Sequence, residues 1–228
     1  MNPVTLSEQI LLAVKTEEDT QALVDTIAGL PADFHTTHLQ EEAAKKAFWI
    51  NIYNAYFLIL RKIQKLDKKE IYTKKAFTIG NTRFSLDDVE HGILRKYRYK
   101  FSLGYLPNHF AKKHIKRLAV NKVDYRIHFA LNCGAISCPP IAFYQADRIE
   151  EQLEMAAMAF LEGETTFFDE KKEVHISRLM LWYRGDFGGK KGIRKMLHRY
   201  LNKPVKGYKL IFKSYDWTEK LDNFIAFE

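Results

Sequence analysis

A run of fourteen residues, Ala47 to Leu60, limits what this chain can fold into more than any other segment. When it is wound into a helix, the run is apolar on nearly every side and is interrupted only by Asn51 and Asn54. Such a helix must be buried on most of its surface. A membrane span needs about 18 or more apolar residues. The run therefore predicts a buried central helix over roughly 40–66 and no transmembrane segment.

The patterns on either side predict helices and hairpins that are segregated rather than strictly alternating, which is typical of an α+β fold. We expect a central buried helix packed on a small, mostly antiparallel sheet, with additional helices at both ends. A capping box at Ser85–Asp88 predicts the start of one of these helices. The expected helices span 6–15, 17–30, 85–97, 147–162 and 191–201, and the expected hairpins pair 76–79 with 83–85 and 167–168 with 173–177.

Composition limits the class of protein. With 46% hydrophobic and 14% aromatic residues over 228 positions, the chain can bury a large core and is not mainly disordered. We expect a single domain over 1–228, with a helical N-terminal extension over 1–40. The N-terminus has no basic start followed by an apolar core. This favours a cytoplasmic location and leaves a periplasmic or secreted one open if the chain is processed.

The segment His128–Pro140 contains both cysteines, Cys133 and Cys138. Alternating apolar residues over 125–131 predict a strand, and the glycine and prolines that follow predict a tight turn. A strand that ends in such a turn commonly places reactive groups at the end of a sheet. Taken alone, the cysteines fit small buried hydrophobic side chains, and a bridge between them is conceivable across the turn.

A second interpretation makes Cys133 a nucleophile, because it lies where the predicted strand meets the turn. His91 or His128 would be its base, and Glu90 or an asparagine would orient that base. His128 reaches Cys133 only if the turn at Gly134 brings them together. Turn amides would bind an oxyanion, so the candidate binding residues are Gly134, Ser137, Cys138 and Asp186.

Asn51 and Asn54 are three positions apart, so they share one face of the predicted central helix. A buried amide needs partners for its donors and its acceptor. The structural interpretation is that both side chains bind neighbouring backbone and fix how the helix packs. The functional one is that one of them orients a catalytic group or stabilises an oxyanion.

Two other site arrangements stay open. The order Cys133 or Cys138, then His175, then Asp186 is that of papain- and transglutaminase-like sites, although those folds usually place the cysteine at a helix N-terminus. Glu90, His91, His128 and Cys133 include metal-ligating side chains, but no short spacing that is typical of zinc joins them. We therefore predict no metal and no cofactor.

Charge is unevenly distributed along the chain. Residues 184–213 contain ten Lys and Arg against one acid, whereas 1–47 contain eight acids against three bases. The two parts could cover each other, or the basic part could bind an acidic partner. Tyr183, Tyr200 and Tyr208 lie among the basic residues, which is compatible with nucleic-acid binding, although such basic helices are more often solvated.

Several blocks together resemble domain-of-unknown-function family 547, whose members occur in bacteria and eukaryotes. The resemblance covers roughly 48–217 and implies no assigned activity, but some members are joined to glutaredoxin-like domains, which suggests thiol chemistry. His175 lies outside these blocks. The blocks are Phe48–Tyr56, Ser85–Arg95, His128–Pro140, Trp182–Gly188 and Tyr215–Trp217.

These observations favour a cysteine-dependent hydrolase or acyltransferase that acts on an amide or thioester in a small-molecule or peptide substrate. The alternative is a non-catalytic binding module that uses 184–213 for an acidic partner, with nucleic acid the less favoured one. The oligomeric state stays open.

Overall fold

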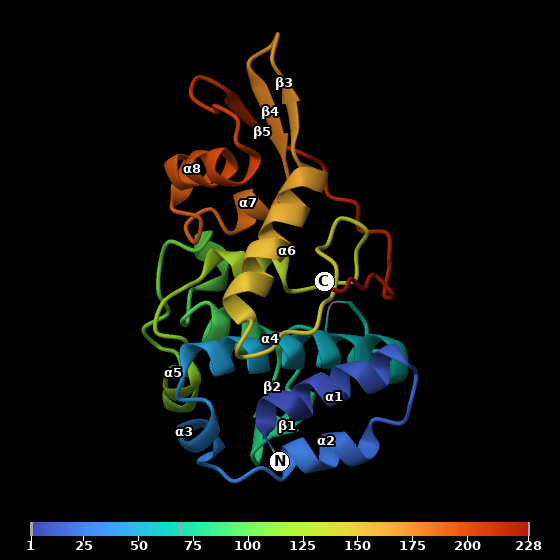
Figure 1. Ribbon diagram of the computed structural model, residues 1–228. Helices are drawn as coiled ribbons and strands as arrows, with labels where there is room; N and C mark the ends of the chain where they lie inside the picture. Colours follow the sequence, from blue (N-terminus) through green and yellow to red (C-terminus); the bar gives the residue numbers. More distant parts are fainter. Residues whose placement is uncertain (1, 69, 228) are drawn as a thin grey trace.

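The structure is a computed structural model that describes residues 2–68 and 70–227. Helices form its lower part, and a small sheet stands at the opposite end (Figure 1). This is the expected α+β architecture. The α-helices of the described residues are α1 Pro3–Lys15, α2 Gln21–Ala28, α3 Phe34–His38, α4 Glu42–Leu58, α5 Lys113–Leu118, α6 Ile149–Glu164, α7 Leu179–Trp182 and α8 Gly189–Leu201.

Four segments wind more tightly or more loosely than an α-helix. The helix predicted from the capping box at Ser85 is present, because the Asp88 amide donates to Ser85 Oγ and the Ser85 amide donates to Asp88 Oδ2. It continues as a π-helix, a form that is frequent at functional sites. The two segments that wind more loosely are the π-helices η1 Ile59–Ile63 and η2 Asp88–Leu94. The two that wind more tightly are the 3-10 helices η3 Lys100–Ser102 and η4 Tyr125–Phe129.

The predicted central helix is α4, extended by η1. Every residue from Lys46 to Leu58 is buried, because α1 packs along one side and η2 and α6 cover others. The apolar run therefore produces the buried helix that its composition requires. Among the described residues, no helix is both long and apolar enough to cross a membrane.

Two small sheets flank the helices. One sheet is the antiparallel hairpin of β1 and β2. It packs on α4 because Tyr56 stacks on Phe77 and Trp49 contacts Phe84. In the other sheet, β4 pairs antiparallel with β3 and parallel with β5. Both predicted hairpins are present, and among the named strands of the described residues only the β4–β5 pair is parallel. The strands are β1 Phe77–Ile79, β2 Thr82–Phe84, β3 Thr166–Phe168, β4 Glu173–Ile176 and β5 Lys209–Phe212.

The strand predicted over 125–131 is wrong, because this segment forms the 3-10 helix η4. Asp124 caps it by accepting a hydrogen bond from the Arg126 amide. The Ile127 amide then donates to the Asp124 carbonyl, which closes the first turn. A local cap of this kind competes directly with strand pairing, and it outweighs the alternating apolar pattern.

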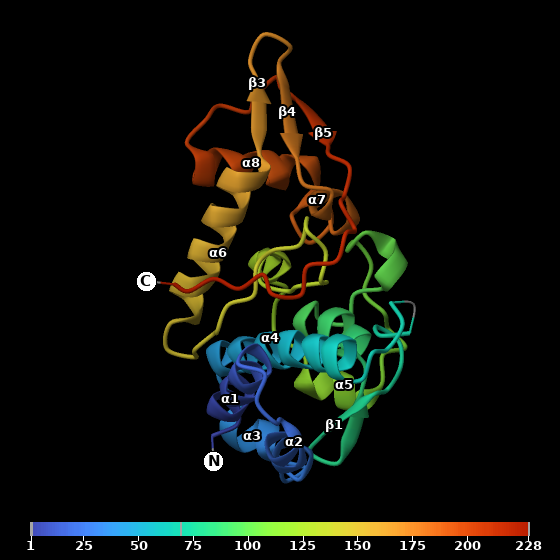
Figure 2. The same ribbon diagram turned by 90° about the vertical axis from the view of Figure 1, so that its right-hand side faces the viewer.

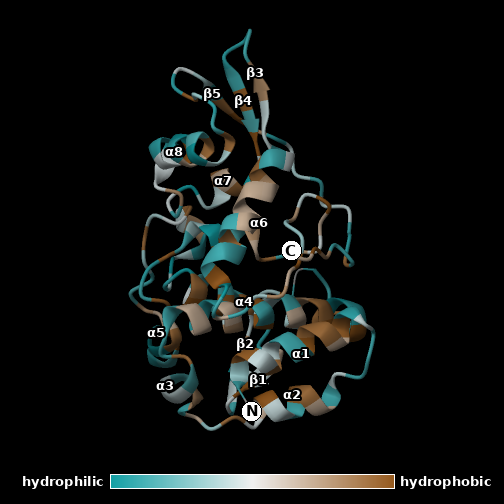
Figure 3. Cartoon of the chain, in the orientation of Figure 1, coloured by the Kyte–Doolittle hydropathy of each residue, from teal (hydrophilic) through white to brown (hydrophobic). Residues whose placement is uncertain are grey.

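The acidic N-terminal part does not cover the basic segment. Helices α1–α3 lie at one end of the molecule and α8 at the other (Figures 1 and 2). The acid that pairs with α8 comes from α6, where Glu154 accepts from Arg199 at 2.8 Å. The alternative in which the two parts cover each other is therefore wrong, and α8 presents a largely hydrophilic surface (Figure 3).

A C-terminal strap, residues 213–227, runs from the sheet across the middle of the molecule (Figure 2). It is fastened to the cysteine turn by backbone hydrogen bonds from Ile136 to Thr218 and from Lys220 to Gly134. Gly134 has φ +72°, and a Cβ there would lie 2.7 Å from Phe57 and 2.8 Å from Leu221. This position therefore requires glycine for both its conformation and its close packing.

We expect Gly134→Ala to lower the free energy of unfolding by about 2–4 kcal/mol, because it adds a strained positive φ to overpacking. Urea denaturation measures this change. Gly163→Ala in α6 is the matched control, since nothing lies within 4 Å of the added Cβ. In a helix this exchange should stabilise the protein by about 0.5–1 kcal/mol. Equal effects of the two substitutions would contradict the requirement for glycine at position 134.

Candidate functional site

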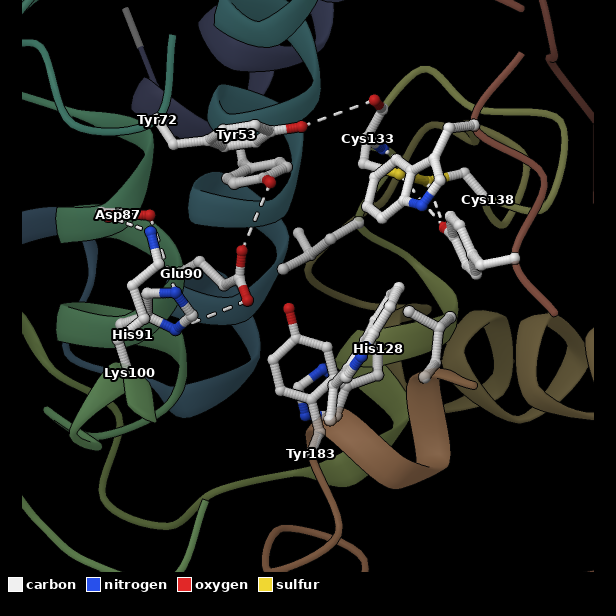
Figure 4. Close-up of a pocket in the computed structure, with 15 residues that line it drawn as sticks. Tyr53, Tyr72, Asp87, Glu90, His91, Lys100, His128, Cys133, Cys138 and Tyr183 are labelled. Carbon is white, nitrogen blue, oxygen red and sulfur yellow. Dashed lines mark hydrogen bonds and ion pairs between the residues drawn. A yellow bond between two sulfur atoms is a disulfide. The ribbon is translucent and has the colours of Figure 1, made fainter. Parts of the chain in front are cut away.

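A pocket of about 340 Å³ lies between α4, η2, the cysteine turn, α7 and the C-terminal strap (Figure 4). Its volume is at the lower end of the range for small-molecule sites. Five candidate residues from the sequence line it: Glu90, His91, His128, Cys133 and Cys138. The complete lining is Tyr53, Tyr72, Asp87, Glu90, His91, Lys100, His128, Leu131, Cys133, Cys138, Leu179, Trp182, Tyr183, Tyr215 and Trp217.

The two cysteines form a disulfide on the wall of this pocket. Cys133 is half-buried, and Cys138 is only 5% exposed. The Tyr215 hydroxyl from the C-terminal strap lies 3.1 Å from Cys133 Sγ and 3.0 Å from Cys138 Sγ. The Cys133 amide also donates to Cys138 Sγ at 2.8 Å. Burial raises the pKa of Tyr215, so its hydroxyl remains a hydrogen-bond donor.

Two of the turn amides expected to bind an oxyanion are already engaged within the protein. The Gly134 amide donates to Asn132 Oδ1 at 2.6 Å, and the Cys138 amide donates to the Ala135 carbonyl. Ser137 lies outside the pocket, where its Oγ accepts from the Asp216 amide. Donors with partners of this kind hold the turn and the strap together and are not free to bind an anion.

A buried chain of polar groups lies behind the pocket. His128 Nε2 is 2.8 Å from Asp186 Oδ2, which also accepts from Arg95 Nε at 2.6 Å. Arg95 Nη1 is 2.6 Å from His91 Nδ1. Arginine can only donate, so His91 Nδ1 is the acceptor. Through Arg95, the two predicted histidines belong to one network, although their ring nitrogens do not bind each other.

Asp186 is held beneath the pocket, where the glycine-rich loop crosses the loop that contains Gly104. The Gly185 amide donates to the Leu103 carbonyl at 2.7 Å. A Cβ on Gly185 would lie 2.5 Å from the Gly104 backbone. Without glycine at position 185 the two loops could not approach this closely, and Asp186 would not reach Arg95 and His128.

Burial lowers the pKa of both histidines. For His128 this effect outweighs the opposing influence of Asp186, and for His91 it outweighs that of Glu90. Both rings are therefore neutral near pH 7. Burial raises the pKa of Asp186, but the hydrogen bond from His128 and the charge of Arg95 bring it below its usual value. Asp186 is thus ionised and holds His128 with Nε2 as the donor and Nδ1 unprotonated.

Glu90 is a buried carboxylate that points into the pocket (Figure 4). Its Oε2 accepts from the Tyr53 hydroxyl at 3.3 Å. Burial raises its pKa, but the neighbouring His91, the charge of Arg95 and the nearby Tyr183 hydroxyl lower it below the usual value. The group therefore carries a negative charge inside the pocket.

Asn51 and Asn54 lie outside the pocket lining and are completely buried. Asn51 donates to the Tyr144 carbonyl at 2.8 Å and accepts from the Tyr144 amide at 3.0 Å. Asn54 donates to the Ala130 carbonyl and accepts from the Asn132 amide in the same way. Their amides clamp the segments before and after the cysteine turn onto α4. These contacts match the structural interpretation of the sequence.

The order Cys, His175, Asp186 does not form a site. His175 lies on β4 beside Glu173, 3.3 Å away, whereas Asp186 binds His128. The tyrosines of the basic segment are also engaged. Tyr200 donates to Glu154, Tyr208 donates to Asp169, and Tyr183 lines the pocket. Across residues 2–68 and 70–227, no group of three or more His, Cys, Asp or Glu is placed to hold a metal ion.

Arg95, Tyr215 and the aromatic side chains Tyr53, Trp182 and Trp217 were not among the site residues predicted from the sequence. All five lie inside the sequence blocks of the family resemblance. That membership is the signal that could have found them. Nothing in local spacing shows that Tyr215 reaches a disulfide about 80 positions earlier in the chain.

The fold and site define an α+β protein with an aromatic pocket that contains a disulfide, a buried carboxylate and an Asp–His pair. The family described as "Protein of unknown function, DUF547" matches residues 36–161, and the chain belongs to this family. No curated protein and no solved structure shows significant similarity to the chain. Asp186 and Tyr215 lie beyond the matched residues, so later segments complete the site.

We expect Arg95→Met to lower the free energy of unfolding by about 3–5 kcal/mol, because it leaves Asp186 charged and buried without its cation. The double variant with Asp186→Asn should lose less than the sum of the two single variants. Urea denaturation of all three variants measures the coupling. The control is Lys74→Met at the exposed pair with Glu70, which should cost at most about 1 kcal/mol. If the effects of Arg95→Met and Asp186→Asn were additive, the two buried side chains would not stabilise each other as an ion pair.

The histidine pKa values predict a pH dependence of stability. Below the ordinary value of 6.5, the unfolded chain binds protons that the folded histidines do not. The free energy of unfolding should therefore fall as the pH falls, by up to about 1.4 kcal/mol per pH unit for each histidine.

The variant His128→Gln removes one of the two groups and should make the decline below about pH 6.5 shallower. Urea denaturation at several pH values measures the slope. His109→Gln changes an exposed histidine and should leave the slope unchanged. If the stability of His128→Gln declined with falling pH as steeply as that of the wild type, His128 would not be held neutral in the folded protein.

Proposed function

We propose that the protein is a cysteine-dependent enzyme that acts on a small molecule in the central pocket. Its reactive group is the Cys133–Cys138 pair, which cycles between disulfide and dithiol. The observation that carries the proposal is that this disulfide lines a small-molecule-sized pocket with a hydroxyl donor 3.0–3.1 Å from both sulfurs. Disulfides that only staple a fold need no such pocket or donor.

The two sulfurs have different roles in thiol–disulfide exchange. Cys133 is the more accessible, so a thiolate entering from the pocket attacks its Sγ. Cys138 is the leaving group, because the Cys133 amide and the Tyr215 hydroxyl donate to its sulfur. Hydrogen bonds to a thiolate lower its pKa, and a leaving thiol of lower pKa departs faster.

The reaction balances with two molecules of a small thiol, RSH. The first loses its proton and bonds to Cys133, the Cys133–Cys138 bond breaks, and Cys138 takes up a proton. The second RSH attacks the sulfur of R in the mixed disulfide, and Cys133 leaves and is protonated. The products are RSSR and the reduced cysteine pair. The two thiols are oxidised, and the disulfide is reduced by two electrons.

A second candidate is acyl transfer or hydrolysis of an amide or thioester by the reduced protein. It is favoured by His128, which lines the same pocket and is held by Asp186 at 2.8 Å with Nδ1 free to act as a base. Cys133 would then form the acyl-enzyme. It ranks second, because Tyr215 rather than a histidine lies beside the sulfur and the amides of Gly134 and Cys138 are occupied.

A binding module built on residues 184–213 is less favoured than either enzyme. The basic side chains of α8 are mostly exposed, which suits phosphate contacts. However, the tyrosines expected to stack on bases are engaged in the pocket or with acidic side chains. If the protein bound a short nucleic acid and the binding weakened steeply with added salt, the binding-module alternative would be favoured.

The redox proposal is tested with glutathione as the thiol. Tyr215→Phe keeps the aromatic ring but removes the hydroxyl donor from Cys138. We expect reduction of the disulfide to become roughly tenfold slower, which corresponds to the loss of one charge-assisted hydrogen bond. Thiol titration over time measures the rate. Tyr99→Phe, at an exposed tyrosine outside the pocket lining, is the control and should leave the rate unchanged.

Single-cysteine variants identify the attacked sulfur. Cys138→Ser should accumulate a mixed disulfide with oxidised glutathione at Cys133, visible by mass spectrometry. Cys133→Ser should react at least about tenfold more slowly, because Cys138 is buried. Equal, slow reaction of both thiols, together with an unchanged rate in Tyr215→Phe, would refute the proposal. Turnover of a thioester by reduced protein that is lost in His128→Gln would instead support acyl transfer.

A further inference from the structure

Among the described residues, one oxygen of the buried Glu90 carboxylate accepts no hydrogen bond, although the Tyr183 hydroxyl lies near the group. Glu90 is 6% exposed, and its Oε1 lacks a partner, whereas Oε2 accepts from Tyr53. His91 Nδ1 is 3.5 Å from Oε1 but cannot donate to it. Its lone pair already accepts from Arg95 Nη1, so this nitrogen has no proton.

A buried charged acceptor without a donor is costly, and proteins rarely leave one unsatisfied. This oxygen belongs to a residue that lines the pocket, and the side chain points into it (Figure 4). A ligand that supplies an N–H or O–H donor at this point would satisfy the oxygen. The most favourable donor is a positively charged one, because charge-assisted hydrogen bonds are the strongest.

The other charged groups at the pocket are paired. Lys100 lies 2.7 Å from Asp87, and Arg95 lies 2.6 Å from Asp186 beneath the wall. With both pairs balanced and the histidines neutral, Glu90 leaves the pocket with one uncompensated negative charge. A low-dielectric cavity strengthens the attraction between such a charge and a cation.

Aromatic rings form the wall near the pocket mouth. The ring centroids of Trp182, Tyr215 and Trp217 lie 4.6–5.6 Å from one another, and Trp217 is 56% exposed. Aromatic faces attract cations, tryptophan most strongly. In the described part of the chain, no Lys or Arg lies over these three rings, whereas the Tyr183 ring is already covered by Arg95 at 4.6 Å.

We propose that the pocket binds a small organic cation with a primary or secondary ammonium group. Glu90 is its counter-ion, and Trp182, Tyr215 and Trp217 form the aromatic wall around its carbon skeleton. An ammonium N–H satisfies the free carboxylate oxygen, which a quaternary ammonium cannot do. The inference rests on the proposed function only in assigning the substrate to this pocket, and binding does not require a reactive cysteine.

The experiment is isothermal titration calorimetry on the full chain with the disulfide closed. The probes are butylammonium, benzylammonium and 2-phenylethylammonium, together with three comparison compounds built on the phenylethyl skeleton. These are 2-phenylethanol, which is neutral, 3-phenylpropanoate, which is anionic, and (2-phenylethyl)trimethylammonium, which has no N–H. We expect at least one primary ammonium to bind at least roughly tenfold more tightly than each comparison compound.

Variants test the residues that carry the inference. Glu90→Gln keeps the shape of the side chain but removes its charge, and should weaken the best ammonium at least roughly tenfold. Trp217→Leu removes a ring that is 56% exposed, and should weaken ammonium binding several-fold. The control is Glu162→Gln, at an exposed acid on α6, which should bind as wild type does.

The inference is overturned if no ammonium probe binds, if the neutral or anionic compound binds as tightly, or if a folded Glu90→Gln binds the ammonium normally. If Glu90→Gln does not fold, the probe series and Trp217→Leu decide. Ammonium binding combined with an inert disulfide would refute the proposed function alone. Rapid exchange with glutathione but no ammonium binding would refute this inference alone.

Discussion

The site depends on one buried ion pair, that of Arg95 with Asp186. Both side chains are completely buried, and their atoms approach within 2.6 Å. Removing either partner would leave an uncompensated charge in the interior, which is far more costly than losing a surface pair. Because Arg95 lies just beyond η2 and Asp186 in the glycine-rich loop, the pair fixes two distant segments around the pocket. Arg95 also orders His91, and Asp186 orders His128.

The disulfide depends on a second set of constraints, which comes from the backbone. Asn54 clamps the segment before the turn, Gly134 permits its sharp bend, and the C-terminal strap is bonded across it. The strap brings Tyr215 to both sulfurs and Trp217 to the pocket mouth. The polar chemistry of the pocket and its aromatic wall are therefore assembled from segments that meet only in the folded chain.

Taken together, the pocket has two chemically different sides. One has the cysteine pair with its hydroxyl donor, and the other has a charged carboxylate with a free oxygen beside neutral histidines. A ligand held through its ammonium group at Glu90 would extend toward the aromatic wall and the disulfide. This arrangement connects the proposed thiol chemistry with the proposed class of ligand, although each depends on different atoms.

The sequence by itself determined the central helix, both hairpins and the capped helix at Ser85, because each depends on local periodicity, turn residues or a cap. It also singled out Glu90, His91, His128 and the two cysteines, which line the pocket. Only the tertiary structure decided the rest. The Asp124 cap replaced the predicted strand at His128, and Asn51 and Asn54 became backbone clamps. Arg95 and Tyr215 joined the site through contacts about 80 to 90 positions away in sequence. Such contacts depend on how segments pack, and no local pattern encodes them.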